Sequence, residues 1–203
     1  MKIGAVILAG GKSRRMGKDK ASLSYEGQRF IMRIAEELEC FDEIILSAND
    51  SSLYEDSDLT IVKDIYPDCG PLGGLHAALC SCKSDALFCI PCDVPLFKLS
   101  LAEYVCSMAK EDVDAVVPVS KDGHMHPLCA VYKKTAAPVF EKQLILKKYK
   151  IIDAYEFMNV RYIPLETNFV ERYLFNVNTP EDYEQLRDLP KLTVEGGKTN
   201  YEI

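Results

Sequence analysis

Short apolar runs alternate with helical repeats along the first part of the chain. Residues 2–8, 43–48 and 86–91 are rich in apolar side chains, which is typical of strands buried on both faces of a sheet. Residues 28–40 carry apolar side chains at intervals of three and four, and residues 72–82 form a second helical segment. Strands that alternate with helices in this way predict a mostly parallel sheet with helices on both faces.

The alternation continues toward the C-terminus with a change of rhythm after the middle of the chain. The pattern predicts further strands at 60–63, 114–118, 127–132 and 159–163 and further helices at 99–110 and 135–148. A last helix begins with Thr179 as its N-cap and Pro180 in its first turn, and it ends near Leu189. We therefore expect one α/β domain over residues 1–189, a three-layer α/β/α fold with a doubly wound, mostly parallel sheet, followed by a C-terminal tail over 190–203.

The chain has more acidic than basic residues, which argues against nucleic acid as a partner. Its 203 residues include 24 Lys and Arg against 31 Asp and Glu, a formal net charge of −7. Sequence-independent binding of nucleic acid depends on many cations that neutralise phosphates, so we expect no nucleic-acid partner. No apolar run approaches the roughly 18 residues of a membrane span, and the apolar run at the N-terminus is too short for a signal peptide. We expect a cytoplasmic protein without membrane association.

The eight cysteines raise the alternatives of disulfides or a zinc site. A chain of this length can build a core without disulfides, so free and mostly buried thiols are expected. The strongest spacing for zinc is Cys80 and Cys82 followed by Cys89 and Cys92. The first pair lies about 200° apart on a helix, and the second pair alternates faces at the end of a strand, so convergence on a tetrahedral site is not expected.

The densest positive charge follows the first strand directly. Residues 8–20 read Leu-Ala-Gly-Gly-Lys-Ser-Arg-Arg-Met-Gly-Lys-Asp-Lys, with three glycines and five Lys or Arg in the nine positions 12–20. Glycines let backbone N–H groups approach an anion and the cations attract it, so a triphosphate is the expected ligand. The spacing matches neither G-x-G-x-x-G nor the P-loop pattern G-x-x-x-x-G-K-[ST]. A solvated basic turn is the alternative interpretation.

Two aspartates follow predicted strands at the same edge of the sheet. Asp93 stands just past the strand 86–91, in Pro-Cys-Asp-Val-Pro, and Asp64 follows the strand 60–63. Open α/β sheets bind ligands beyond the carboxyl ends of their strands, where a carboxylate can hold Mg²⁺ together with phosphate oxygens. The alternative is that Asp93 caps a loop or helix and that Asp64 is a surface acid. The segment Gly-Pro-Leu-Gly-Gly at 70–74 opens the next helix, whose free N–H groups are expected near the same crevice.

The loop over residues 8–20 resembles the signature L-A-G-G-x-S-x-R-M-G-x-D-K of the nucleotidyltransferase superfamily, in the version of the molybdenum cofactor guanylyltransferases. The resemblance runs from residue 3 to near residue 188 and includes Pro-Cys-Asp-x-Pro and Asn-Val-Asn-Thr-Pro-Glu. The chain departs from the family at Ser47, where an Asn is common. It also departs before the helix at about residues 150–158, where the family often has an Arg and this chain has Lys147, Lys148 and Lys150 instead.

The resemblance implies a set of site residues. Those implied to bind the nucleotide are Leu8, Ala9, Gly10, Gly11, Lys20, Ser47, Asn49, Asp64 and Asp93. Those implied to be catalytic are Arg15, Lys20 and Asp93, with Asp93 as the ligand of an Mg²⁺ cofactor. Those implied to line the acceptor site are Asn176 and Asn178. The segment 123–128, Gly-His-Met-His-Pro-Leu, is similar to a hairpin near the acceptor site, and we expect its histidines to form hydrogen bonds rather than bind a metal.

The activity that the resemblance implies is a nucleotidyl transfer. A phosphate oxygen of molybdenum-bearing molybdopterin attacks the α-phosphorus of GTP, which yields the guanine dinucleotide and pyrophosphate. Alignment and charge stabilisation can carry such a step without a protein nucleophile. The alternatives are a cytidylyltransferase of the same superfamily, acting on molybdopterin or on a sugar or polyol phosphate, and a non-catalytic nucleotide-binding module. Transient contact with other proteins of cofactor biosynthesis is a further expectation.

Overall fold

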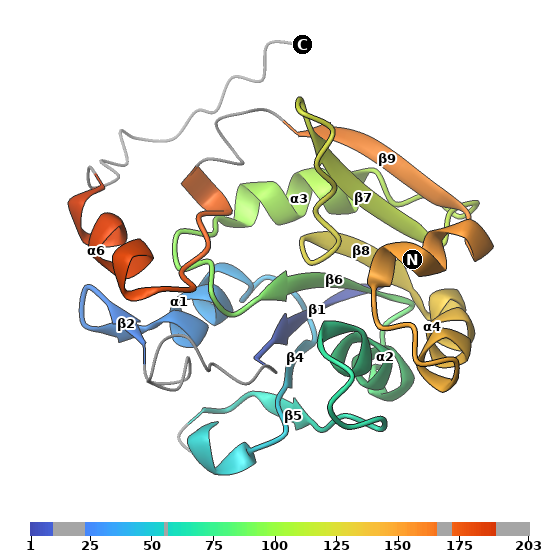
Figure 1. Cartoon of the computed structure of the whole chain (residues 1–203), viewed down its shortest axis with the longest axis horizontal. Coiled ribbons are helices and arrows are strands. Elements are labelled where there is room, and N and C mark those ends of the chain that lie inside the picture. Colours follow the sequence, from blue (N-terminus) through green and yellow to red (C-terminus); the bar gives the residue numbers. More distant parts are fainter. Residues whose placement is uncertain (10–22, 55–56, 166–171, 190–203) are drawn as a thin grey trace.

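A seven-stranded sheet forms the centre of the protein (Figure 1). The computed structural model describes residues 1–9, 23–54, 57–165 and 172–189. The strands of the sheet are β1 (Ile3–Leu8), β4 (Ile44–Ser47), β5 (Thr60–Val62), β6 (Ala86–Pro91), β7 (Ala115–Ser120), β8 (Ala130–Lys133) and β9 (Val160–Leu165). The α-helices are α1 (Phe30–Glu37), α2 (Pro71–Ser81), α3 (Leu99–Ser107), α4 (Ala137–Ile145) and α6 (Pro180–Asp188). Three 3₁₀ segments, η2 (Ser51–Tyr54), η3 (Lys134–Ala136) and η4 (Ile151–Phe157), and the hairpin β2 (Ser24–Tyr25) and β3 (Gln28–Arg29) complete the set.

The order of the strands is β5-β4-β1-β6-β8-β7-β9. β1 pairs in parallel with β4 and β6, β4 with β5, and β7 with β9. β8 alone of these strands runs antiparallel to its neighbours, β6 and β7. The prediction of a mostly parallel sheet is therefore confirmed.

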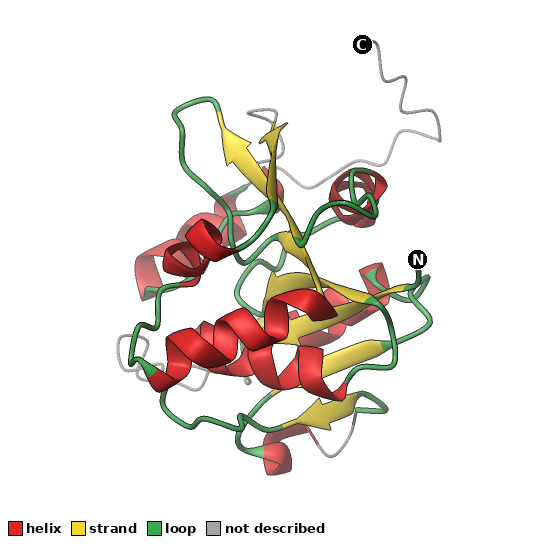
Figure 2. Cartoon of the chain, turned by 90° about the vertical axis from the view of Figure 1, so that its right-hand side faces the viewer, coloured by secondary structure: helices red, strands yellow, loops and turns green. Residues whose placement is uncertain are grey.

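Both faces of the sheet are covered by helices (Figures 1 and 2). On β1, Ala5 and Ile7 belong to a core cluster with residues of α1 and α3, whereas Val6 and Leu8 belong to a second cluster with residues of α2 and α4. Successive side chains of a strand point to opposite faces, so a run that is apolar at every position needs a covered surface on each side. The three-layer arrangement follows from this pattern, as predicted.

The ends of several elements differ from the sequence prediction for local reasons. The helix predicted from residue 28 begins at Phe30, because the two residues before it pair with β2 in the small hairpin. The strand predicted from residue 127 begins at Ala130, because the Cys129 N–H donates to the His126 carbonyl at 3.0 Å and closes a turn first. The helix predicted over 135–148 begins as η3 and continues as α4 only to Ile145.

All eight cysteines are free, and five of them are buried: Cys69, Cys82, Cys89, Cys92 and Cys129. Cys89 lies inside β6 at no exposure, whereas Cys80 is exposed on α2. Within the described residues, no three His, Cys, Asp or Glu side chains are grouped closely enough to hold a metal ion between them. Among the same residues, none of the helices is both long and apolar enough to cross a membrane.

Glu43 links the beginning of β4 to the beginning of β6. It lies at the end of the sheet opposite to the carboxyl ends of β1 and β6. Its carboxylate accepts hydrogen bonds from the Lys83 N–H at 2.8 Å, the Ser84 N–H at 2.9 Å and the Ser84 hydroxyl at 2.6 Å. Burial raises the pKa of Glu43, but these hydrogen bonds outweigh burial and leave the pKa below its ordinary value.

We expect Glu43→Ala to lower the free energy of unfolding by about 1 kcal/mol at pH 7, because three donors lose their acceptor. A carboxyl group whose pKa is lowered on folding stabilises the protein above its ordinary pKa of 4.5 and loses that contribution as the pH falls through this range. The difference between wild type and variant in denaturant titrations should therefore shrink below pH 4.5. The exposed Glu39→Ala is the control. Equal stability of both variants at pH 7 would contradict the prediction.

Candidate active site

The order of the strands reverses between β1 and β6. After β1 the chain adds β4 and β5 on one side, and β6 then pairs with the other side of β1. Such a switch point opens a crevice beyond the carboxyl ends of the two strands, where α/β sheets bind their ligands. Leu8 at the end of β1 is in register with Pro91 at the end of β6, and the Cys92 N–H donates to the Leu8 carbonyl at 3.0 Å. The ends of β1 and β6 therefore lie side by side where the chain leaves the sheet at Leu8 and Cys92.

Asp93 lies at this switch point. It is 8% exposed, and its backbone carbonyl accepts a hydrogen bond from the Val177 N–H at 2.9 Å. A carboxylate is a hard oxygen ligand, and Mg²⁺ usually takes one or two protein carboxylates together with phosphate oxygens and water. The chemistry and position of Asp93 fit such a shared site. The described residues do not provide a group of three or more side-chain ligands that could hold a metal ion without phosphate.

The segment around Val177 is fixed by the start of α6. The Asp182 N–H donates to the Thr179 hydroxyl at 3.2 Å, and Asp182 Oδ2 accepts from the Asn178 and Thr179 N–H groups at 2.8 and 2.9 Å. This reciprocal capping box confirms Thr179 as the predicted N-cap. The Asn178 amide donates to Asn176 Oδ1 at 2.8 Å. The cap therefore holds both asparagines next to the carbonyl contact with the switch point.

Asn49 and Asp64 form a reciprocal pair beyond the ends of β4 and β5. The Asn49 side-chain amide donates to Asp64 Oδ2 at 2.9 Å, and the Asp64 N–H donates to Asn49 Oδ1 at 3.0 Å. Burial raises the pKa of Asp64, the hydrogen bond from Asn49 lowers it in part, and the charge of Asp68 raises it further. The net shift is upward, so the ionised carboxylate is less favourable here than in water.

Ser47 is buried at 1% exposure under the first turn of α2. A Cβ atom built on Gly74 would lie 2.4 Å from Ser47 Oγ and 3.4 Å from Asp64 Oδ1. Glycine at position 74 therefore lets the helix approach the end of β4 closely. The Ala9 N–H donates to the Ser47 carbonyl at 2.9 Å, which ties β4 to the beginning of the glycine-rich loop. The structure brings Leu8, Ala9, Ser47, Asn49 and Asp64 to one edge of the sheet.

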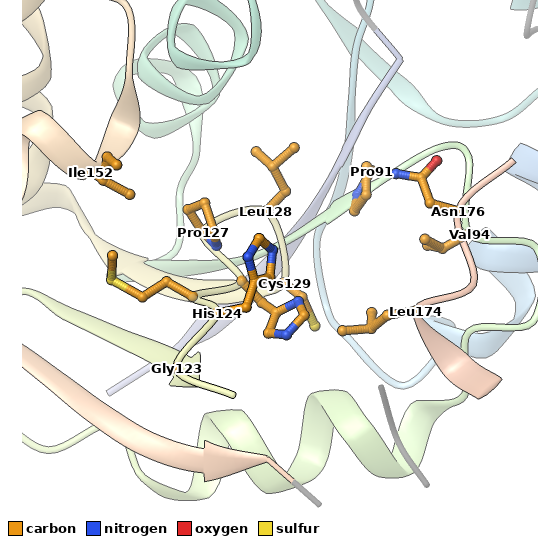
Figure 3. Close-up of a pocket in the computed structure, with 12 residues that line it drawn as sticks. Pro91, Val94, Gly123, His124, Pro127, Leu128, Cys129, Ile152, Leu174 and Asn176 are labelled. Carbon is orange, nitrogen blue, oxygen red and sulfur yellow. The ribbon is translucent and has the colours of Figure 1, made fainter. Parts of the chain in front are cut away.

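A cavity of about 480 Å³ is lined by Pro91 and Val94, which lie on either side of Asp93 in the sequence (Figure 3). One wall is the hairpin segment 123–129, and Ile152 of η4 and Leu174 line other parts. Asn176 lines it as well, so residues that flank Asp93 in sequence and in space reach the cavity. Most of its lining side chains are apolar, which is typical of a site for a small organic molecule.

His126 is a polar residue of this wall whose side chain is fixed by its contacts with Ser120 and His124. Its Nε2 lies 2.5 Å from the Ser120 hydroxyl oxygen, and its ring meets the His124 ring edge-on with centroids 5.0 Å apart. Burial lowers the pKa of His126, the charge of His124 lowers it further, and Asp122 offsets part of the shift. The ring is therefore neutral at pH 7 and has a hydrogen-bonding role, as the sequence predicted.

Four residues of the predicted site, Gly10, Gly11, Arg15 and Lys20, lie outside the described residues. Sequence reasoning missed the cavity-lining Ile152 and Leu174, because each stands beside other apolar or aromatic residues and the local pattern does not distinguish a cavity wall from a core. The hairpin at 123–128 had a signal, its resemblance to an acceptor-site segment, although none of its residues was included in the predicted site.

The fold is that of an α/β nucleotidyltransferase. The sheet matches that of molybdopterin-guanine dinucleotide biosynthesis protein A from Archaeoglobus fulgidus with a TM-score of 0.80 and 26% identity, over 93% of this chain and 98% of the other. A probable molybdenum cofactor guanylyltransferase of Clostridium perfringens is 37% identical over 194 residues, which cover 92% of this chain and 96% of that protein. A probable molybdenum cofactor guanylyltransferase of Carboxydothermus hydrogenoformans is 38% identical over 185 residues, which cover 89% and 92%.

The model of the MobA-like NTP transferase domain matches residues 5–156. The chain belongs to this family and is an enzyme, a nucleotidyltransferase. The resemblance inferred from the glycine-rich loop is thereby confirmed, as is the predicted fold.

Proposed function

We propose that the protein transfers GMP from GTP to the terminal phosphate of molybdenum-molybdopterin, with Mg²⁺ as cofactor. The names of the relatives that match nearly the whole chain support guanylyl transfer in the biosynthesis of the molybdenum cofactor. The observation that carries the proposal is the position of Asp93. Its carboxylate follows β6 at the switch point, and its carbonyl is bonded to the segment whose Asn176 lines the adjacent cavity.

The nucleotide binds, in this proposal, on the side of β1, β4 and β5. The loop after Ala9 supplies backbone N–H groups and cations for the triphosphate. Asn49 and Asp64, beyond the ends of β4 and β5, supply an amide and a carboxylate for the base or ribose, and Ser47 supports them from below. Two polar groups that already bond each other are preorganised, which lowers the entropy cost of binding.

The acceptor binds in the cavity on the opposite side of Asp93. Its apolar walls suit a flat organic ring system, whereas Asn176 and Asn178 flank Val177, whose N–H donates to the Asp93 carbonyl, and would orient the phosphate of the acceptor. The acceptor phosphate oxygen then forms a bond to the α-phosphorus, and the bond to the departing pyrophosphate breaks. Held in this geometry, the two substrates react as if in one molecule.

The chain itself supplies charge and alignment. Asp93 would hold Mg²⁺, which when bound neutralises phosphate charge and orients the triphosphate. Arg15 and Lys20 offset the charge on the α-phosphoryl group and on the leaving pyrophosphate. The acceptor phosphate is already an anion, so the protein does not need a general base or a covalent nucleophile.

The test is to incubate the protein with Mg²⁺, molybdenum-molybdopterin and either GTP or CTP, and to measure pyrophosphate and the dinucleotide product. Pyrophosphate with GTP is the expected result. Turnover with CTP alone, on molybdopterin or on a sugar or polyol phosphate, would overturn the choice of substrate. Binding of GTP with Mg²⁺ but no pyrophosphate with any acceptor would identify a non-catalytic nucleotide-binding module.

We expect Asp64→Asn to weaken nucleotide binding without lowering the stability of the protein. The pKa of Asp64 is raised, so its ionised form destabilises the folded protein at pH 7, and this cost disappears as the pH falls through the folded-state pKa. The amide variant can still accept the Asn49 hydrogen bond but carries no charge. We expect a thermal midpoint at pH 7 equal to or above that of wild type and a KM for GTP raised by about tenfold. The exposed Asp58→Asn is the control, and an unchanged KM for GTP in Asp64→Asn would remove Asp64 from the nucleotide site.

A further inference from the structure

Two buried tyrosines lie behind the wall of the acceptor cavity. Tyr132 of β8 has no exposed surface, and Tyr155 of η4 is 8% exposed. Their hydroxyl oxygens are 2.8 Å apart, and the Tyr132 hydroxyl donates to the Pro127 carbonyl at 2.7 Å. The Tyr132 ring packs edge-on against Phe140 of α4, with centroids 5.4 Å apart, which holds the ring in place.

The hydrogen bonds run in one direction. A tyrosine hydroxyl has a single hydrogen, and that of Tyr132 is directed to Pro127, so Tyr132 accepts from Tyr155. Burial raises the pKa of both hydroxyls above the ordinary tyrosine value, so both keep their hydrogens throughout the neutral range. The result is a permanent chain from Tyr155 through Tyr132 to the Pro127 carbonyl.

Each end of this chain belongs to a segment that lines the cavity. Pro127 is part of the 123–129 wall, and Tyr155 is in the same 3₁₀ segment as Ile152, which lines the cavity from another side. A buried hydroxyl without a partner is costly, whereas phenylalanine would fill the same space at no such cost. The hydroxyls therefore link the turn before β8 to η4, two segments that the backbone hydrogen bonds of β8 do not join. They are placed to set the separation between these segments.

We propose that Tyr132 and Tyr155 are positioning residues for the acceptor: their hydroxyl chain holds the 126–129 turn and η4 at the separation that the acceptor needs. This proposal rests on the proposed function, in which the acceptor occupies the cavity. Neither tyrosine lines the cavity, so the hydroxyls act through Pro127 and Ile152 and not by touching substrate.

Steady-state kinetics with GTP and molybdenum-molybdopterin test the proposal on Tyr132→Phe and Tyr155→Phe. Tyr132→Phe leaves both the Pro127 carbonyl and the Tyr155 hydroxyl without this partner, so we expect the KM for molybdopterin to rise about tenfold, with the KM for GTP within about twofold of wild type. Tyr155→Phe keeps the bond to Pro127 and should have a smaller effect in the same direction. Tyr162→Phe is the matched control, because the Tyr162 ring contacts Tyr155 but its hydroxyl forms no hydrogen bond among the described residues.

Amide hydrogen exchange provides a readout that needs no substrate. The His126 N–H donates to the Pro118 carbonyl at 2.9 Å and the Cys129 N–H donates to the His126 carbonyl at 3.0 Å, so both amides report on the turn. We expect both to exchange about tenfold faster in Tyr132→Phe, while the Val177 N–H on the other side of the cavity keeps its rate.

Equal changes of KM for both substrates, or unchanged exchange at both amides, would overturn the proposal. A wild-type protein that transfers no GMP would instead overturn the proposed function, and exchange would still decide whether the hydroxyls hold the turn. If Tyr132→Phe does not fold, the KM for molybdopterin and the amide exchange rates of Tyr155→Phe test the proposal instead.

Discussion

Asp93→Ala should lose at least about 100-fold in guanylyl transfer at saturating GTP and acceptor, because it removes the carboxylate that, in the proposed mechanism, would hold the metal against the phosphates at the switch point. The loss should appear in kcat as well as in kcat/KM, since the interaction is stronger in the transition state than with bound GTP. Asp93→Asn, which keeps the shape but not the charge, should require a higher Mg²⁺ concentration for its residual activity.

The stability of the same variant provides the contrast. Asp93 is 8% exposed, and a carboxylate kept at an active site for function commonly lowers stability, so that its removal can raise stability. Its carbonyl bond to Val177 is made by the backbone and survives the substitution. We therefore expect the thermal midpoint of Asp93→Ala to equal or exceed that of wild type. The exposed Asp188→Asn, at the end of α6, is the control for a lost negative charge. Full activity in Asp93→Ala at low Mg²⁺ would remove this residue from the metal site and with it the mechanism proposed above.

Gly74→Ala should damage both stability and nucleotide binding. The new Cβ would meet Ser47 Oγ at 2.4 Å, far inside van der Waals contact, and Ser47 is buried at 1% exposure with little room to move. The first turn of α2 must then shift away from the end of β4. Overpacking of this kind typically lowers the free energy of unfolding by about 1–3 kcal/mol. Because Asp64 Oδ1 lies 3.4 Å from the same Cβ position, we also expect the KM for GTP to rise by about tenfold or more.

A double-mutant cycle identifies the cause. Ser47→Ala removes the oxygen atom that the new methyl group meets, so Gly74→Ala with Ser47→Ala should recover most of the stability that Gly74→Ala loses. Urea titrations of the four proteins measure the coupling. Additive losses in the double variant would contradict the steric explanation and would place the cost in the backbone of the helix instead.

The central strands and the position of Asp93 just past β6 could be predicted from the sequence because both depend on local pattern. A short apolar run such as Ile3–Leu8, bounded by turn residues, is typical of a strand covered on both faces, and Asp93 is a polar residue two positions after another such run. The cap at Thr179 was predictable for the same reason, since its partner Asp182 is three residues away.

Contacts between distant segments could not be predicted in this way. Ser47 reads as a polar residue at the end of a strand, but its burial depends on how closely α2 packs on β4, which Gly74 decides from another element. The direction of β8 and the turn before it also depend on pairing with β6 and β7, not on the pattern of residues 127–132.

The alternation of strands and helices, the glycine-rich basic loop after the first strand and the aspartate after a later strand could all be read from the chain alone, because each is a property of neighbouring residues, and the nucleotidyltransferase class followed from the resemblance of that loop to a known family. The contact of Val177 with the Asp93 carbonyl, the neighbouring cavity and the hydrogen-bonded chain of Tyr155, Tyr132 and Pro127 became visible only in the folded protein. Those features arise where chain folding brings remote segments within the short range of hydrogen bonds and packing, and no local pattern encodes that proximity.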